Sequence, residues 1–421
     1  MIPASRFRAH WITLVALAYL AFCLFAATLH AQLAEVTADQ AVALYRERSP
    51  RLAASRATID VTAADRIDAG LYPNPTLSLG TTNIVQGQDT FGHSQENLGL
   101  DIPILIGGQR GQRARTADAR VAARRAEVDL EQARAELEIR RRFVALLAAQ
   151  DKLAALGAAL DDATAVRAIV AGRQQAGAKS PYDLERTDLA LAALASKRAE
   201  AATEQAAASA ALAEAVGIAG WQPRAAGAFR PTDDAAPAAA PVAAPATPGN
   251  DHPELVAGLA AEAAARSEEA LAHAEAVPTP SLQVQGFGTT DPQGIALTVG
   301  VAIPLPVFDR NQGAVARARA QQRAAELDHR ATGVELTAEL VRATALERTR
   351  RAAVAQFEAD AIARLPRIRA MAEASYRSGQ GSLVELLDAL DAITEARLRD
   401  IELIAAALDA ELDVRAASRG R

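Results

Sequence analysis

The chain has 421 residues, a formal net charge of −6 and one cysteine, and 50% of its residues are hydrophobic. Alanine accounts for 105 residues, whereas the aromatic residues make up only 4%. Burial energy scales with apolar area at roughly 25 cal/mol per Å², so this chain lacks the large side chains that fill the thick core of an ordinary globular domain. The composition favours long, closely packed helices, and the acidic balance argues against a nucleic-acid partner.

Residues 1–31 have the layout of a secretory signal peptide. Two arginines precede an apolar run over residues 11–29, and small and polar residues lead to an expected cleavage after Ala31. An uncleaved membrane anchor is the alternative, because the run is long enough to span a bilayer. Cys23 lies inside this segment, and bulky Phe22 before it disfavours a lipoprotein anchor. The mature chain is therefore expected to lack disulfides and thiol sites.

The pattern of the remaining residues indicates a tandem duplication. We expect a first repeat over residues 32–220 and a second over 251–421, joined by an extended, poorly packed Pro/Ala-rich linker at 221–250. Three landmarks recur in the same order at offsets of 201 to 205 residues: Pro73-Asn74-Pro75 and Pro278-Thr279-Pro280, Ile102-Pro103 and Ile303-Pro304, and Gly177 and Gly379.

Each repeat is predicted to contain two strands. A first helix (about 37–70, or 253–276) leads to segments that alternate apolar with small or polar residues, which is typical of strands. They lie at about 75–86 and 95–104 in the first repeat, and at about 280–289 and 294–304 in the second. The residues assigned to the apolar faces are Leu98, Leu100 and Ile102, then Leu282, Val284 and Phe287, and then Ile295, Leu297, Val299, Val301 and Ile303.

Each strand pair is followed by a long helical hairpin. The first repeat has no proline over residues 113–171, and large apolar residues recur there at intervals of seven, as in a coiled coil. In the second repeat the helix is expected over 313–363, with a break at Pro366 and a continuation to Ser378. A returning helix of about 35 residues follows each one.

The strands are of the right length for tilted transmembrane β-strands, about 9–11 residues each. Beyond the first 31 residues we expect no stretch apolar enough for a transmembrane helix, so any membrane crossing must use strands. Four strands cannot close a barrel, and open edges in lipid would leave unpaired backbone groups. Several copies must then pool their strands. Two soluble hairpins capping a helical bundle are the alternative.

The segments PNPTLSLG, PTPSLQVQG, IPILIGGQR, IPLPVFDRNQG and YRSGQGSLVELLDAL resemble the TolC family of outer-membrane efflux channels, over essentially the whole mature chain. The resemblance implies a mainly α protomer with a small transmembrane β part. Each protomer of a homotrimer would contribute four strands to a twelve-stranded barrel, with long coiled-coil-like helices in the periplasm and residues 221–250 in an equatorial region.

The resemblance also implies a function. The chain would be the outer-membrane channel of a tripartite efflux system, a passive exit duct served by a periplasmic membrane-fusion adaptor and an inner-membrane pump of the resistance-nodulation-division (RND) type. Ile303–Gly313 most resembles the heavy-metal (cobalt-zinc-cadmium or copper-silver) branch, which implies heavy-metal cations as cargo. Alternatives are a type I secretion channel, a multidrug efflux channel, and a soluble periplasmic coiled-coil adaptor or scaffold.

Site residues follow from the same resemblance. Two adaptor-docking tips are expected, one at Ala176, Gly177 and Ala178 and one at Ser378, Gly379 and Gln380. Asp183 and Tyr376 match an entrance gating contact, and Gly381 stands where the family prototype has a further arginine. Glu385 and Asp388 match an acidic ring at the channel entrance, which Asp391 could extend. From the residues alone, plain turns and a solvated helix face are the alternatives.

No enzyme, cofactor or metal site is expected. The glycine-rich segment Gly107–Gly111 lies between a strand and a helix but lacks the Lys-Ser/Thr pair of a phosphate loop. The four histidines beyond residue 31 are scattered, without the i,i+3 or i,i+4 spacing of helical metal ligands. No nucleophile and base can be paired by spacing.

Overall fold

The computed structural model describes residues 35–83, 94–175, 181–231, 247–290 and 293–419. The predicted signal peptide at 1–31 lies outside these residues. The chain divides into two compact units. Unit 1 comprises Met1–Leu52, Gln132–Gly249 and Leu336–Arg421, and unit 2 comprises Ala53–Glu131 and Asn250–Glu335.

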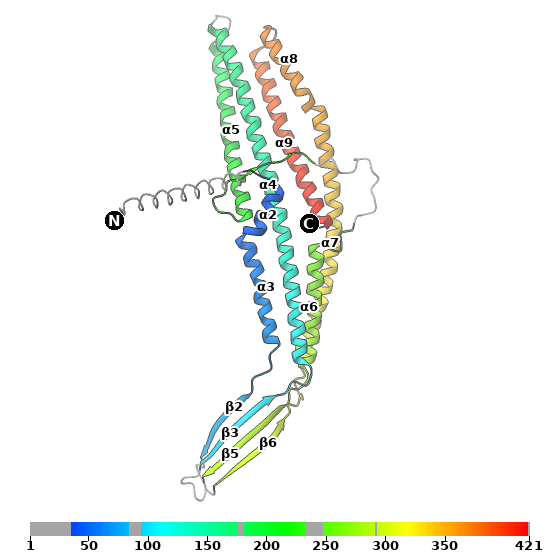
Figure 1. Ribbon diagram of the computed structural model, residues 1–421. Coiled ribbons are helices and arrows are strands. Elements are labelled where there is room, and N and C mark those ends of the chain that lie inside the picture. Colours follow the sequence, from blue (N-terminus) through cyan, green and yellow to red (C-terminus); the bar gives the residue numbers. More distant parts are fainter. Residues whose placement is uncertain (1–34, 84–93, 176–180, 232–246, 291–292, 420–421) are drawn as a thin grey trace, which may run out of the picture. The chain divides into compact units, whose positions relative to one another are not determined.

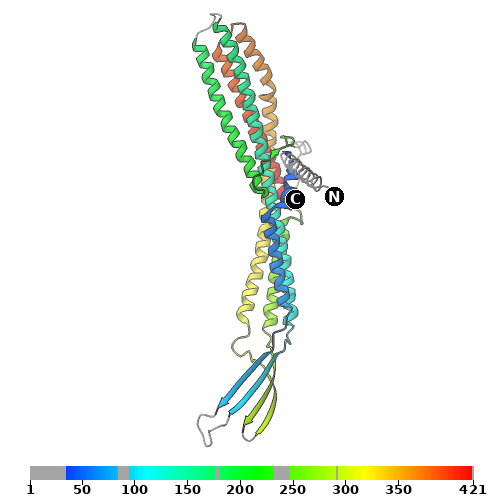
Figure 2. The same cartoon turned by 60° about the vertical axis from the view of Figure 1, so that its left-hand side comes forward.

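Unit 2 contains one four-stranded antiparallel sheet in the order β2-β3-β5-β6, which Figures 1 and 2 show as a single layer. The register places Leu77 opposite Leu100 and Val284 opposite Val299. Side chains on directly opposed residues share a face, so the apolar positions of all four strands gather on one side. The strands are β2 (Thr76–Asn83), β3 (Ser94–Pro103), β5 (Ser281–Thr290) and β6 (Gln293–Ala302).

The helical part of unit 2 repeats the order of the strands. Arg66 of α3 pairs with Asp118 of α4 at 2.8 Å, and Thr116 of α4 bonds to the Ser267 carbonyl of α6 at 3.0 Å. Glu269 of α6 in turn pairs with Arg319 of α7 at 3.1 Å. The helix order α3-α4-α6-α7 therefore matches β2-β3-β5-β6. These helices are α3 (Pro50–Ala69), α4 (Gln109–Gln175), α6 (Pro253–Glu275) and α7 (Gln312–Asp360), and α4 and α7 continue into unit 1.

Unit 1 packs its helices around a core that includes the start of the predicted linker. The linker was expected to be poorly packed, and for its first residues this is wrong. Trp221 and Ala225 are buried with Tyr45 and Leu212, and the Gln150 side chain bonds to both backbone groups of Ala225. Burial of the Trp221 indole stabilises this segment more strongly than its prolines favour an extended, exposed chain. The elements around this core are β1 (Glu35–Val36), α2 (Ala38–Arg48), α5 (Pro181–Val216) and β4 (Arg224–Ala225), with β1 and β4 paired in parallel.

Prolines break two of the helices. The first helix was expected to run unbroken over about 37–70, but it ends at Arg48 and restarts at Pro50, because a proline forces the preceding residue out of the helical region. Ser49 is extended, with ψ 117°. Near the predicted break at Pro366, α7 ends at Asp360, a short 3-10 turn follows, and Pro366 itself lies in the first turn of α8. The remaining elements are η1 (Ile362–Arg364), α8 (Leu365–Arg377) and α9 (Leu383–Arg419).

Helix α4 is more apolar than expected. Within the described residues, α4 contains an 18-residue window of mean hydropathy 1.5, apolar enough by composition to cross a membrane. The expectation that no such stretch follows residue 31 is therefore wrong. Its side chains at Ile139, Phe143 and Leu146 belong to the buried core of unit 1. Packing against α2 and α5 covers only part of this apolar window, of which 33% is buried.

Candidate functional site

The turn between α8 and α9 is closed by a Schellman motif. The Gln380 N–H donates to the Ser375 carbonyl at 3.1 Å, and the Gly379 N–H donates to the Tyr376 carbonyl at 3.1 Å. Gly379 takes the left-handed conformation this motif requires, with φ 75°. Within the predicted tip, Ser378 is the C-cap residue of α8. The tip at Ser378, Gly379 and Gln380 is thus a fixed reversal of the chain.

The predicted acidic pair lies at the start of α9. Ser382 and Glu385 form a capping box, in which the Glu385 N–H donates to Ser382 Oγ at 3.2 Å and the Ser382 N–H donates to Glu385 Oε2 at 3.1 Å. Asp388 follows one turn later and is exposed, as are Glu385 and Asp391. Glu385 therefore has a local structural role that sequence spacing did not predict.

Tyr376 is buried, not exposed at the tip. It is 1% exposed and packs in a cluster with Val170 and Leu386. The Arg173 guanidinium lies 4.6 Å from the centre of its ring, and Arg173 donates to the carbonyls of Tyr376 and Arg377 at 3.1 and 2.9 Å. These bonds satisfy the last carbonyls of α8. Tyr376 thereby anchors the end of α8 to α4.

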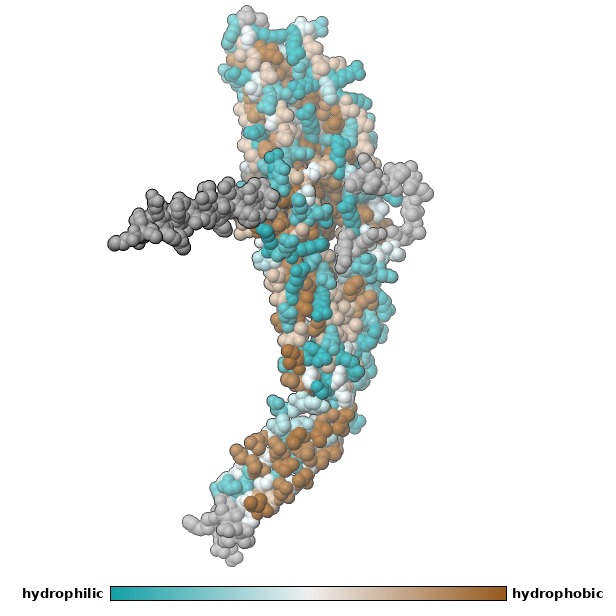
Figure 3. Space-filling view, viewed as in Figure 1, coloured by the Kyte–Doolittle hydropathy of each residue, from teal (hydrophilic) through white to brown (hydrophobic). Residues whose placement is uncertain are grey.

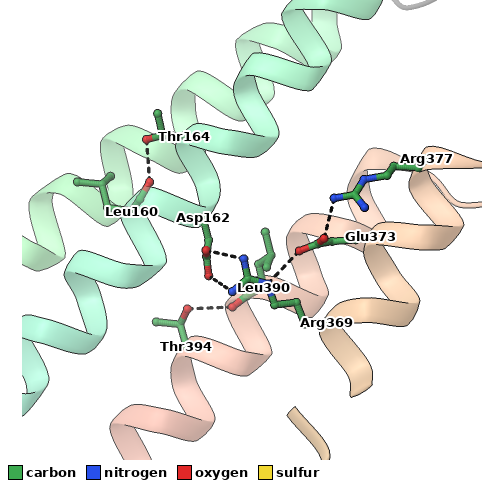
Figure 4. Close-up of polar contacts among 8 residues, drawn as sticks. All are labelled: Leu160, Asp162, Thr164, Arg369, Glu373, Arg377, Leu390 and Thr394. Atoms are coloured by element: carbon green, nitrogen blue, oxygen red, sulfur yellow. Dashed lines mark hydrogen bonds and ion pairs between the residues drawn. The ribbon is translucent and has the colours of Figure 1, made fainter. Parts of the chain in front are cut away.

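A chain of ion pairs continues this attachment away from the tip (Figure 4). Arg369 of α8 binds both carboxylate oxygens of Asp162 in α4, at 2.7 and 2.6 Å, and also Glu373 at 2.9 Å. Glu373 in turn accepts from Arg377 at 2.8 Å. The i,i+4 spacing of the three α8 residues is visible in the sequence, but nothing there identifies Asp162 as their partner.

The first predicted tip lies outside the described residues. This tip comprises Ala176, Gly177 and Ala178. The predicted gating residue Asp183 lies in the first turn of α5, and its carbonyl accepts from Thr187 Oγ1 at 2.8 Å. Leu184, the next residue, packs on the cluster that buries Tyr376. The two hairpin helices are joined by Arg167 and Asp188, and the hydrogen bond from Arg167 lowers the pKa of Asp188 below its usual value.

The sheet of unit 2 has one apolar and one polar face. On the apolar face, Leu79 is 77% exposed, Leu297 72% and Ile295 91%. Figure 3 shows a hydrophobic surface over the strands. The opposite face carries Ser78, Gly99, Gln285 and Thr298 in register. Such alternation suits a sheet between lipid and water.

One residue of the sheet was assigned to the wrong face. Phe287 was expected with Leu282 and Val284, but it pairs with Ala296 and Asn97 on the polar face. Its odd-numbered position follows Gln283 and Gln285, and the strict period of two decides its side.

Among the described residues, no group of three or more His, Cys, Asp or Glu side chains is placed to hold a metal ion. The ion pairs at the α8 end join acids to arginines. Chemically, this end of unit 1 offers a fixed turn, an exposed acidic helix start and a buried anchor.

Comparison with known proteins identifies the family to which the chain belongs. The family described as outer membrane efflux protein matches residues 41–218 and 250–418. Among curated proteins, the cobalt-zinc-cadmium resistance protein CzcC of Cupriavidus metallidurans is 25% identical over 377 residues, covering 86% of this chain and 85% of CzcC.

Solved structures share the fold at low identity. CusC superposes with a TM-score of 0.72 at 17% identity, covering 91% of this chain and 92% of CusC. The outer membrane protein VceC of Vibrio cholerae gives 0.70 at 16%, covering 90% and 95%. The mainly helical fold with a small sheet is therefore that of the TolC-like proteins. The chain belongs to the outer membrane efflux protein family, and is an efflux channel of the outer membrane with its helices in the periplasm.

Proposed function

We propose that three copies of this chain form a ring in which the four strands of each copy pool into a twelve-stranded barrel. The observation that carries this proposal is the sheet of unit 2, which has an exposed apolar face, a polar face and two outer strands, β2 and β6, each paired on one side within the described residues. A sheet in lipid must close on itself, and four strands are too few.

The channel serves as the passive exit duct of a tripartite system. A periplasmic adaptor docks at the two tips, one formed by Ala176, Gly177 and Ala178 and the other by Ser378, Gly379 and Gln380, and an RND pump supplies the cargo. The fixed reversal at Gly379 supports this proposal, because a rigid turn presents the same backbone surface in each copy.

Heavy-metal cations are the proposed cargo. The likeness to CzcC, a cobalt-zinc-cadmium resistance protein, supports this choice. Glu385 and Asp388 are exposed at the start of α9, and threefold repetition would surround the entrance with carboxylates, which attract cations. Drugs or secreted proteins are the alternative cargoes of an outer-membrane channel.

Asp183 and Tyr376 are proposed to hold the entrance closed. Tyr376 is buried where α8 meets α4, and Leu184, beside Asp183, packs on the same cluster. Movement of α8 away from α4 would have to expose this ring, which costs about 2 kcal/mol or more in lost burial. The closed entrance is thus tied to the attachment of α8.

Deletion of the gene tests the cargo. Loss of the chain should lower tolerance to at least one of zinc, cobalt, cadmium, nickel, copper and silver, and the intact gene on a plasmid should restore it. Sensitivity to drugs alone would favour the multidrug alternative, and defective export of a protein would favour the secretion channel. Unchanged tolerance to all six metals in a strain without a second such channel would contradict the metal proposal.

A further inference from the structure

The two repeats meet inside the chain at a specific joint near the sheet. The turn that leads from β3 into α4 packs on the connection between α6 and β5. The Ile104 N–H donates to the Pro280 carbonyl at 2.7 Å, and the Gln109 side chain donates to the Val277 carbonyl at 3.1 Å. A Cβ on Gly107 would lie 2.5 Å from Val277 Cβ. A strand-to-helix turn of one repeat is thereby fitted onto the helix-to-strand connection of the other.

The duplication supplies a second copy of both halves of this joint. Gln312 opens α7 as Gln109 opens α4, since its side chain accepts from the Arg310 N–H at 2.7 Å where Gln109 accepts from the Gly107 N–H at 2.9 Å. Tyr72 precedes Pro73-Asn74-Pro75 as Val277 precedes Pro278-Thr279-Pro280. These second halves lie on the two outer edges of unit 2, one after β6 and one before β2.

Both outer halves expose large apolar side chains. Phe308 is 92% exposed and Val307 60%, while Leu71 is 58% and Tyr72 61% exposed. The same edges continue along the helices, where Val61 of α3 is 69% and Val334 of α7 72% exposed. Proteins rarely expose large apolar side chains together in this way unless a partner covers them.

The turn that carries Phe308 is held in place by hydrogen bonds. Asn311 is left-handed, with φ 61°, and its N–H donates to Asp309 Oδ1 at 2.9 Å. Its side chain donates to the Ala272 carbonyl of α6 at 2.8 Å. From the Ile-Pro landmark to the capping glutamine, this turn is two residues longer than its counterpart (303 to 312 against 102 to 109). The extra length places Phe308 outward on a fixed support.

We propose that the turn at 305–308 of one copy docks on the Leu71–Tyr72 connection of a second copy of this chain. The joint repeats between copies the hydrogen bonds that Ile104 and Gln109 make within a copy, and Phe308 lies in the two additional residues of the outer turn. It rests on the proposed ring and deepens it by naming the residues that join its members. Strand direction agrees, because β2 and β6 run in opposite directions and the antiparallel alternation continues when β6 meets the next β2.

The internal joint also indicates the bonds that form. The Leu305 N–H corresponds to that of Ile104, so it donates to the carbonyl of the partner subunit's Pro75. The Gln312 side chain, which bonds to the Phe308 carbonyl at 3.2 Å in the single chain, turns to the carbonyl of the partner subunit's Tyr72. Phe308 then packs against the ring of the partner subunit's Tyr72. Arg110 lies 4.7 Å from the centre of that ring in each copy and fixes its position.

Disulfide cross-linking tests the joint directly. The only cysteine in the chain is Cys23, so a Tyr72→Cys/Phe308→Cys double variant can be oxidised in isolated outer membranes and read on a non-reducing gel. We expect covalent dimers and trimers, at least tenfold above either single variant and lost on reduction. The matched control is Val61→Cys/Phe308→Cys, whose first cysteine replaces a similarly exposed residue on the same edge, eleven residues earlier. The control should form no disulfide and run as a single chain on the gel.

The outcomes separate the joint from the proposed function. If the protein is trimeric by mass in detergent but the double variant does not cross-link, the joint is wrong and the channel proposal stands. If it is monomeric in the membrane, both fail. Cross-linking of Phe308→Cys alone would indicate a symmetric contact and overturn the joint. So would labelling of uncross-linked Phe308→Cys by a lipid-soluble maleimide only, because Phe308 would then face lipid.

Discussion

Arg369 binds both carboxylate oxygens of Asp162, at 2.7 and 2.6 Å, although the two residues are 207 positions apart in the chain. The pair fixes α8 to α4. Arg369 lies in α8, the same helix as the buried Tyr376. The position and the rigidity of the α8 end therefore depend on a contact between two helices that are far apart in the chain.

Arg369→Ala should loosen α8 from α4. A partly exposed, two-pronged ion pair contributes about 1 kcal/mol, and its loss should raise the resting conductance of the channel in planar bilayers. The control is Arg399→Ala, which removes an exposed i,i+3 pair with Glu402 inside α9. Equal conductance of the two variants would show that the Asp162 contact does not restrain the entrance.

Gly379→Val should abolish efflux while leaving the assembly intact. A β-branched residue is strained by about 1–2 kcal/mol or more at the left-handed position, and its side chain would alter the tip surface. Gly379→Asn separates the two effects, because asparagine tolerates this backbone. If Gly379→Asn also fails in a metal-tolerance assay, the adaptor needs the bare backbone there. Full efflux by Gly379→Val would show that this turn is not a docking tip.

Leu297→Lys and Thr298→Lys are neighbouring changes on opposite faces of β6. A lysine facing lipid near the middle of a strand costs about 2–4 kcal/mol, so Leu297→Lys should reduce the amount of protein in the outer membrane severalfold. Thr298→Lys faces the polar side and should be tolerated. Immunoblots of fractionated membranes give the comparison. Equal insertion of both variants would contradict the assignment of the lipid face.

Glu385→Gln/Asp388→Asn should reduce the preference of the channel for cations. Glutamine can still complete the capping box with Ser382, so the change removes charge without unwinding α9. Reversal potentials in a salt gradient measure the preference. Glu395→Gln, an exposed acid further along α9, is the control. Unchanged selectivity in the double variant would favour a plain solvated helix face.

Asp409→Asn should stabilise the protein at neutral pH. Burial raises the pKa of Asp409, with Asp413 and Glu138 adding to the rise and Arg141 and Arg350 opposing it. The folded state thus favours the protonated acid, and stability is lost as pH rises through the raised pKa. The unfolding midpoint of Asp409→Asn should exceed that of the unmodified chain at pH 7, with the gap closing below the usual aspartate pKa. A constant gap would contradict this.

Alternation and repeats predicted the parts of the fold that depend on local pattern. The strands lie where apolar and polar residues alternate, and the hairpin helices lie between glycine and proline signals. Phe287 lies on the polar face, because the strict period of two along a strand decides its side whatever the hydrophobicity of its side chain. A composition rich in proline does not predict the packed start of the linker, because it carries no information about a single buried tryptophan such as Trp221.

The site was predicted less completely, for a different reason. Family likeness pointed to Gly379 and Tyr376, and the left-handed turn follows from glycine alone. The pairing of Asp162 with Arg369, and of Arg173 with Tyr376, depends on how two hairpins pack. Arginines and acids are abundant on every helix of this chain, so no spacing singles out these partners.

The exposure of Phe308 bears on how the protein is made. The joint at Val277 forms whenever one chain folds, whatever the concentration of other copies. The joint at Phe308 forms only when two chains meet, so its formation depends on their concentration. A newly exported chain therefore exposes apolar edges until it assembles with other copies. Its survival in the periplasm should depend on synthesis rate and on holding chaperones more steeply than that of a self-contained protein.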